Sequence, residues 1–559
     1  EIVPSGDLFT VQREINKTVC AFDLSVKFST PVFTDIKDIS AALKRAESGA
    51  ALSLKELLDI KRTLRQINAL CDWYKNVEDR ENELEYLFEM LFPNKYLENK
   101  LEAAIIDEET LADDASPELA SIRRKIANSG IKIRETLDKM IKSSGVNKYL
   151  QDSIVTIRDG RFVLPVKSEH KGQISGLVHD TSATGSTLFI EPMAVVEANN
   201  DIRILQGREQ DEIHRILTEL SGECAQIKEQ LESGYNAATE LNLYFAKANL
   251  AAKMKACAPE LNDDNIIVLN KARHPLINAE DVVPINFSIG EKYNTLIITG
   301  PNTGGKTVVM KTVGLLTLMT MCGMLIPVSD GSKISIYKNI LVDIGDEQSI
   351  EHSLSTFSSH MNRVIGILKK ADYRSLVLLD ELGSGTDPVE GAALAVAVIE
   401  KLKSQGATTI TTTHYQELKM YAIDTPDVEN ASCEFNVDTL KPTYRLIIGA
   451  PGKSNAFAIS SRLGMPDEII SHAQSLITSE NRKFEEIIDN LEKARITLEE
   501  NNKAAERSRK ECEELKRQLE EERERLYNEK EEELEKARRT SADIVNSVQR
   551  QSQRLIDEL

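Results

Sequence analysis

The eight residues from Gly300 to Thr307, G-P-N-T-G-G-K-T, have the types and spacing of a phosphate-binding loop. An apolar stretch from Thr295 to Thr299 precedes them, and a helical pattern follows. Glycines let the backbone wrap closely around phosphates, so that successive N–H groups and the start of the next helix face the anion. We therefore predict an ATP-binding site made of Gly300, Pro301, Asn302, Thr303, Gly304, Gly305, Lys306 and Thr307.

The ionisable and hydroxyl groups around this loop predict hydrolysis. Lys306 would supply a positive charge to the β- and γ-phosphates, and Thr307 would offer its hydroxyl to Mg²⁺. An apolar run, L-V-L-L, ends in two carboxylates, the arrangement of a Walker B strand. We expect Asp380 to hold Mg²⁺ directly or through water, and Glu381 to act as the general base on the attacking water. The alternative, two acids that only cap a turn, is weak with a phosphate loop upstream.

Three further motifs accompany the two Walker elements. S-T-F runs from Ser355 to Phe357, G-S-G-T-D-P follows Glu381 by two residues, and T-T-T leads into His414. A histidine at a strand end beside the nucleotide can contact the γ-phosphate, so we predict a catalytic role for His414; an ordinary, partly buried histidine is the alternative. For the residue that stacks on adenine, His274 and Tyr293 are candidates that no motif decides between.

The order of these motifs resembles the MutS family of ABC-type ATPases. That resemblance implies active sites shared across a dimer interface. Ser355 would reach the γ-phosphate bound to the opposite subunit, so that nucleotide binding and dimer closure become one event. A monomeric P-loop enzyme needs no such signature.

The resemblance extends over nearly the whole chain and favours the type 2 bacterial branch. It is carried by A-R-H-P from Ala272 to Pro275, by the stretch from Val163 to Asp180, and by S-A-T-G-S-T-L-F-I-E-P from Ser182 to Pro192. Only about 290 residues precede the phosphate loop, and the first 150 contain no F-x-E wedge, which distinguishes this chain from a mismatch-repair MutS. Type 2 members end in a small Smr domain linked to nuclease activity or ribosome contact. The chain stops before such a domain, so nuclease chemistry is not assigned to it.

Composition limits the possible partners and compartment. Seven scattered cysteines without a C-x-x-C pair predict reduced thiols in a cytoplasm, which the family resemblance implies is bacterial, and we find no signal peptide or membrane span. The net charge of −20 disfavours a surface that binds nucleic acid everywhere. A local basic lining remains open at Arg123–Lys125 or at Lys167–Lys171, with solvated surface charge as the alternative.

With 559 residues the chain is too long for one core, and we expect four parts. These are a helical lever and core region (1–150), a core region with small β hairpins and lever helices (151–260), an ABC-type ATPase domain (261–478) and a charged coiled coil (479–559). The predicted fold class is thus an α/β ABC-type P-loop ATPase domain plus a mainly helical core and lever region with a small β insert and a C-terminal coiled coil. An Asp159-Gly160 turn predicts one hairpin of the insert.

The last 80 residues repeat apolar side chains every seven positions, as Leu491, Leu498, Ala505, Cys512 and Leu519 illustrate. Such a segment is a coiled coil, either folded back on itself or paired with another chain, and a lone solvated helix is the alternative. The pattern is still running at Leu559, and no methionine starts the chain, so we expect a fragment of a longer protein.

Three functions fit these features. The first is an ATP-driven dimeric clamp that acts on stalled or collided ribosomes, in contact with rRNA, and splits them for quality control. The second is the same clamp closing on branched or junction DNA to suppress recombination. The third, a chromosome-maintenance type of coiled-coil dimer, would separate its Walker motifs by a very long coiled coil, whereas only about 75 residues separate them here. We rank the ribosome clamp first, mainly on the family resemblance.

Overall fold

A computed structural model describes residues 2–34, 36–78, 80–300, 305–345, 356–436, 441–452, 456–476 and 479–557. The chain divides into two compact units. Unit 1 contains Glu1–Asp263, Pro275–Glu280 and Leu315–Lys338, and unit 2 contains Asp264–His274, Asp281–Gly314 and Asn339–Leu559. The four-part division expected from the sequence stays a prediction.

Unit 1 is mainly helical, as its apolar periodicity predicts. One helix shows why: Ser53 and Glu56 form a reciprocal capping box at its start, and its inward face buries Leu57, Leu64 and Ile67. The helices are α1 (Leu8–Phe28), α2 (Ser40–Glu47), α3 (Leu54–Tyr74), α4 (Glu85–Glu89), α5 (Lys95–Ala104), α6 (Pro117–Lys142), α7 (Ser144–Asn147), α8 (Met193–Gln226) and α9 (Lys228–Met254).

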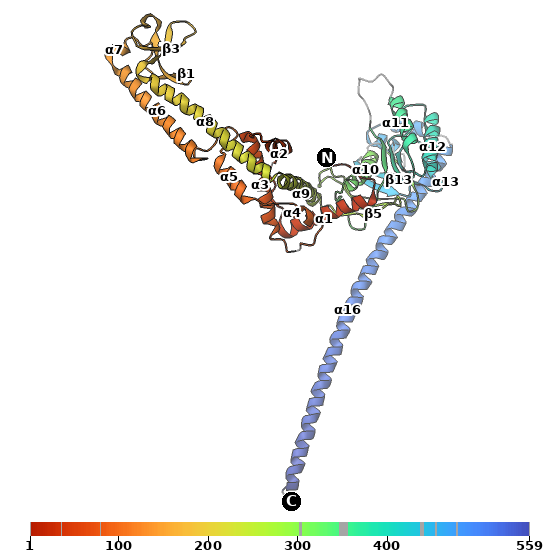
Figure 1. Cartoon of the computed structure of the whole chain (residues 1–559). Coiled ribbons are helices and arrows are strands. Elements are labelled where there is room, and N and C mark those ends of the chain that lie inside the picture. The colour runs from red at the N-terminus through yellow and green to blue at the C-terminus, as the bar shows by residue number, and fades with distance from the viewer. Residues whose placement is uncertain are drawn as a thin grey trace. The chain divides into compact units, whose positions relative to one another are not determined.

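Two of these helices, α6 and α8, lie side by side and lead to a small antiparallel sheet (Figure 1). The sheet has the order β1-β2-β4-β3, with β1 (Thr156–Arg158), β2 (Arg161–Lys167), β3 (Gly176–Thr181) and β4 (Thr187–Pro192). The predicted hairpin is confirmed: β1 pairs with β2 across a two-residue turn. Asp159 and Gly160 both have positive φ, 49° and 75°, as the tight turn requires.

A buried carboxylate ties this sheet to α8. Glu191 is fully buried, and both of its oxygens accept hydrogen bonds from Arg161 Nη1, at 2.8 and 2.9 Å. The amide of Asn199 on α8 donates to the same carboxylate at 2.7 Å, and His179 Nε2 also contacts it. A buried charge is tolerated here because several polar groups satisfy it.

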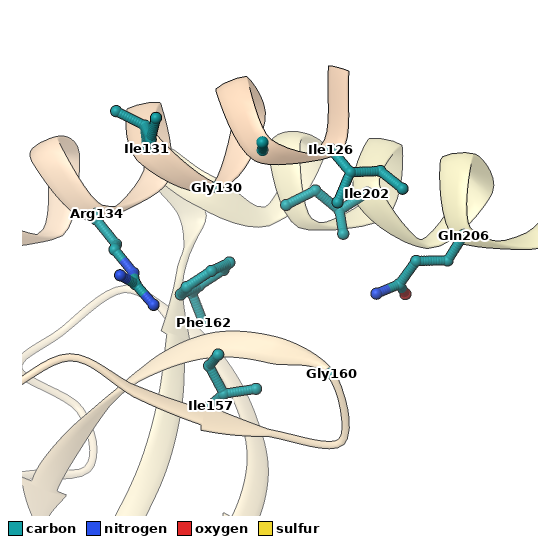
Figure 2. Close-up of a pocket in the computed structure, with 10 residues that line it drawn as sticks. Ile126, Gly130, Ile131, Arg134, Ile157, Gly160, Phe162, Ile202 and Gln206 are labelled. Carbon is teal, nitrogen blue, oxygen red and sulfur yellow. The ribbon is translucent and has the colours of Figure 1, made fainter. Parts of the chain in front are cut away.

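A cavity of about 370 Å³ lies between α6, α8 and the β1–β2 hairpin. The residues that line it include Ile126 and Ile131 on α6, Ile202 on α8 and Ile157 on β1. Figure 2 shows the ring of Phe162 between Ile157 and α6, with the side chain of Ile131 pointing away from the ring. The guanidinium of Arg134 lies 5.5 Å from the centre of that ring. Ile131 and Ile157 are exposed, so this end of unit 1 presents apolar side chains to solvent.

Unit 2 contains a six-stranded sheet of order β10-β11-β12-β8-β13-β14. All neighbours are parallel except β13 and β14, which form an antiparallel edge. Helices pack on the sheet and bury a core that includes Ile297, Val377 and Ile399. The elements of the sheet and its helices are β8 (Thr295–Thr299), β10 (Asn339–Asp343), α11 (Thr356–Lys370), β11 (Ser375–Leu379), α12 (Pro388–Ser404), β12 (Thr408–Thr412), α13 (Gln416–Asp424), β13 (Val428–Asn436) and β14 (Lys441–Ile448).

The remaining elements complete the chain. Helix α10 (Lys306–Met321) begins in unit 2 and ends in unit 1. The short strands are β5 (Glu260–Asn262) and β9 (Lys333–Ser335), which pair in parallel, and β6 (Ile267–Ala272) and β7 (Ile285–Ile289), which pair antiparallel. The C-terminal helices are α14 (Ala456–Arg462), α15 (Asp467–Ser475) and α16 (Ser479–Asp557).

The expected architecture is confirmed: an α/β region with a mainly parallel sheet, helical regions, a small antiparallel sheet and one long C-terminal helix. Some boundaries differ from the sequence prediction. The apolar pattern from Asn265 to Leu269 favours a strand over that range, but β6 begins at Ile267, because Asn265 adopts a positive φ of 63° that a strand does not accommodate. Pairing of α16 in a coiled coil stays a prediction. None of the described helices is long and apolar enough to cross a bilayer.

We predict that Glu191→Ala destabilises the small sheet. The substitution leaves Arg161 and Asn199 without their buried acceptor, which costs about 3 to 5 kcal/mol in comparable buried pairs. Hydrogen exchange of residues 156–192 measures this free energy of local opening. Glu169→Ala is the control, since the Glu169 side chain is 73% exposed and contacts only His170 within the described ion pairs; it should change the same free energy by less than about 0.5 kcal/mol. Equal protection in both variants would contradict the assignment.

Candidate functional site

The phosphate-loop lysine lies where β8 meets α10. Lys306 is the first residue of α10 and is 2% exposed. Its ammonium donates to the carbonyl oxygen of Gly300 at 2.6 Å and to Nε2 of His414 at 3.1 Å. Burial lowers the pKa of Lys306 to about 8, while the carboxylates of Glu381 and Asp380 oppose that shift. The structure therefore places a partly desolvated cation at the N-terminus of a helix, where an anion is favoured.

Asp380 connects three elements of the site. Oδ2 accepts a hydrogen bond from the hydroxyl of Thr307 at 2.8 Å, and Oδ1 accepts one from the hydroxyl of Thr412 at the end of β12. Its own N–H donates to the carbonyl oxygen of Asp343, the last residue of β10, at 2.8 Å. The carboxylate is thus fixed at the carboxyl edge of the sheet, where open α/β folds bind their ligands.

Glu381 adopts a strained backbone. Its φ is +49°, in the left-handed region that a residue with a Cβ rarely enters. The N–H of Glu381 donates to the hydroxyl of Thr412 at 2.8 Å, which helps to hold this conformation. The side chain is 35% exposed, and its Oε1 lies 3.8 Å from His414 Nε2. A carboxylate in this position is accessible to a water molecule.

His414 lies between the cation and the carboxylate. Its Nε2 accepts from Lys306, so the remaining ring proton of the neutral imidazole sits on Nδ1. Burial and then the positive charge of Lys306 lower the pKa of His414. The structure thereby brings together Lys306, Thr307, Asp380, Glu381 and His414, as the sequence prediction places them.

A residue outside the sequence motifs, Tyr444, lies against Gly305 at the end of the phosphate loop. Gly305 has φ +92°, and a Cβ at this position would lie 2.8 Å from Cδ1 of Tyr444 on β14. A larger residue at 305 would therefore meet both a strained backbone and a ring. Pro301, Asn302, Thr303, Gly304 and Ser355 lie outside the described residues, so their assigned roles stay predictions.

The two candidates for adenine stacking occupy different environments. Tyr293 is 8% exposed, and its hydroxyl donates to the carbonyl oxygen of Ser288 at 2.7 Å. It also precedes the N-terminal end of β8, whereas the phosphate loop follows the C-terminal end. Tyr293 is therefore unsuited to stacking on a nucleotide. His274 is half-buried, and burial lowers its pKa.

The residues present fit Mg²⁺. Thr307 and Asp380 offer hard oxygen ligands in hydrogen-bond contact with each other. Mg²⁺ in nucleotide sites is commonly bound by one or two carboxylates together with substrate phosphates and water, so no larger cage is required. Consistent with this, the described residues contain no group of three or more His, Cys, Asp or Glu that would hold a metal alone.

Thr412 is the functional residue that the sequence prediction missed. Its hydroxyl donates to Asp380 and accepts from the N–H of Glu381, so one side chain orients both carboxylate residues. The T-T-T-H run marks the strand end, but three consecutive threonines give no indication of which hydroxyl faces the site.

Comparison with known proteins agrees with this geometry. Residues 296–480 match the family model "MutS domain V". A curated relative named "Endonuclease MutS2" from Acetivibrio thermocellus is 50% identical over 506 residues, which cover 90% of this chain and 64% of the relative. A second protein of that name, from Ruminiclostridium cellulolyticum, is 49% identical over 89% of this chain and 63% of the relative. A third, from Clostridium botulinum strain Kyoto, is 44% identical over all of this chain and 71% of the relative.

We predict that Thr412→Val lowers ATP turnover by about 10- to 100-fold, the usual effect of losing a residue that orients a metal ligand. Steady-state phosphate release measures it. Thr411→Val on the same strand is the matched control: within the described structure the Thr411 hydroxyl has no hydrogen-bond partner, and its loss should leave turnover unchanged. Equal turnover rates in the two variants would show that Thr412 does not contribute to catalysis.

Proposed function

The chain belongs to the MutS2 family, and we propose that it is an ATP-hydrolysing dimeric clamp that acts on stalled or collided ribosomes. The observation that carries the ATPase part is the convergence of Lys306, Thr307, Asp380, Glu381 and His414 at the carboxyl edge of neighbouring parallel strands. The chain spans about 64% of the length of the first two relatives. The nuclease activity in their name is therefore not assigned to these residues.

The proposed hydrolysis divides the work among these side chains. Lys306 binds the β- and γ-phosphates, exchanging its contacts with Gly300 and His414 for phosphate oxygens. Thr307 and Asp380 would hold Mg²⁺, which neutralises charge on the phosphates when bound. Glu381 accepts a proton from the attacking water, and His414 contacts the γ-phosphate.

The dimeric part of the proposal rests on motif order and family membership. Ser355 would complete the site of the opposite subunit, so that each ATP is held between two chains. ATP binding then favours the closed dimer by the difference between its affinities for the closed and open states. Hydrolysis removes that difference and releases the clamp.

The charge distribution supports a nucleic-acid-rich cargo. Helix α6 carries seven Lys or Arg residues against three acidic ones, in a chain of net charge −20. One expected basic contact is occupied: Arg123 is hydrogen-bonded to Glu209 at 2.8 Å and to Asp113 at 2.6 Å. Arg124 and Lys125 remain exposed. The exposed isoleucines beside the cavity of Figure 2 add apolar contact area at this end of unit 1.

The second candidate is a clamp on branched or junction DNA. The printed name of the relatives, which refers to an endonuclease, favours a nucleic-acid substrate for those proteins. The same exposed basic residues of α6, such as Arg124 and Lys125, would serve such a cargo. The net negative charge of the whole chain disfavours an extended duplex-binding face and leaves the ribosome as the first candidate.

We predict that Glu381→Ala traps an ATP-bound closed dimer. Losing the general base slows hydrolysis by about 10²- to 10⁴-fold while the phosphate-binding groups remain. Size-exclusion chromatography with nucleotide analysis of the eluted protein should show retained ATP and a shift to dimer. Glu400→Ala, an exposed acid near the end of α12, is the control and should behave as wild type. A variant that neither retains ATP nor shifts to the dimer would refute the proposal that ATP binding closes the dimer.

The trapped variant also separates the two cargoes. Full-length protein carrying Glu381→Ala is sedimented in parallel with single ribosomes, collided disomes and four-way DNA junctions at matched salt. We expect preferential sedimentation with disomes. Preference for junctions, or equal binding to all three, would overturn the ranking of the ribosome over DNA.

A further inference from the structure

Three polar residues outside the catalytic set meet beside the Walker B strand. Asp343 is 3% exposed, and its two carboxylate oxygens take different partners. Oδ1 accepts from Arg363 Nε at 2.6 Å, and Oδ2 lies 2.9 Å from His360 Nδ1. His360 and Arg363 are three positions apart on α11 and therefore lie on one face of the helix.

This cluster is joined to the catalytic edge through the backbone. Asp343 ends β10, and its carbonyl oxygen accepts the N–H of Asp380 at 2.8 Å. Asp343 thus contacts the Walker B aspartate through its main chain and α11 through its side chain. A shift of α11 along its axis would break both side-chain contacts at once.

Helix α11 is also fixed by packing. Val364 and Ile367 belong to the core against the sheet. Near the helix start, the Cβ of Phe357 lies 3.4 Å from the position that a Cβ on Gly385 would occupy, so the loop after Glu381 lies against Phe357. Apolar packing alone is tolerant of small rotations and slides, whereas a carboxylate shared by two donors defines one position.

The position of α11 matters because the helix begins within the S-T-F motif. The helix begins at Thr356, directly after Ser355. We propose that Asp343, with His360 and Arg363, is a positioning group that sets α11, so that the signature motif at the start of this helix can act on the ATP of a second copy. This inference rests on the proposed composite site. It assigns to residues of one subunit an effect on hydrolysis in the other.

Mixing of two impaired variants tests that assignment. Lys306→Met lacks the phosphate-binding lysine but keeps its α11 anchor, and Arg363→Met has the opposite defect. In a mixed dimer, the intact loop of one protomer faces the intact signature of the other, and one complete site forms. We expect each variant alone to lose about 10- to 100-fold in kcat or more, and an equimolar mixture to regain about a quarter of the wild-type rate, because random pairing gives half mixed dimers with one of two sites complete.

Two measurements keep a folding defect from imitating this result. Arg363→Met should still bind a fluorescent ATP analogue, because its own phosphate loop is intact, whereas a misfolded chain should not. Lys370→Met, an exposed position at the end of the same helix, should keep full activity. If Arg363→Met does not fold, Arg363→Lys replaces it, since lysine keeps the charge but lacks the planar Nε donor.

The Ser355→Ala variant distinguishes the two possible failures. If Ser355→Ala mixed with Lys306→Met regains activity but Arg363→Met with Lys306→Met does not, Arg363 acts within its own subunit and the inference is wrong while the composite site stands. If neither mixture regains activity, the composite site itself is refuted, and the inference falls with it. Recovery in both mixtures is the expected result.

Discussion

The structure of the site depends on the fixed carboxylate of Asp380. Its two oxygens accept hydrogen bonds from the hydroxyl groups of Thr307, on α10, and Thr412, at the end of β12. This contact joins the end of β11 to the end of β12 and to the start of α10, beside the second polar connection that runs from Gly300 through Lys306 to His414. The two threonines hold the carboxylate oxygens in place, which would reduce the reorganisation that binding of Mg²⁺ requires.

In the proposed dimer, the same constraint would relate hydrolysis to the second subunit. Asp380 bonds through its N–H to Asp343, whose side chain holds α11. The proposed general base is its sequence neighbour, Glu381, in a strained conformation stabilised by Thr412. A small movement at the γ-phosphate would therefore be transmitted to the end of β11, to Glu381 and to the start of α11. Such a tightly connected group suits an enzyme in which ATP controls association between two chains.

The sequence predicts the parts of this site whose chemistry is local. The phosphate loop needs glycines, a lysine and a threonine in consecutive positions, and the Walker B carboxylates follow an apolar strand. Both motifs can therefore be recognised from the sequence alone. The Asp159-Gly160 hairpin is legible for the same reason, since two residues determine the turn. Thr412 is not, because three adjacent threonines look alike until the strand register is known.

Contacts between distant segments were also beyond the sequence. Tyr444 lies against Gly305 only because β14 forms the edge of the sheet. Arg363 contacts Asp343 only because α11 packs beside β10. Tyr293 was a reasonable nucleotide contact in sequence, but its position before β8 places it at the wrong edge of the sheet. Strand starts shifted by one or two residues where a positive φ, as at Asn265, interrupts an apolar pattern.

The central claim is that ATP is hydrolysed between two copies of the chain. Specific ATPase activity per chain, measured over a range of protein concentrations with sedimentation of the same samples, tests it most directly. The account predicts that activity per chain rises in parallel with the fraction of dimer and approaches zero where the protein is monomeric. Constant activity per chain across the monomer-to-dimer transition would contradict it.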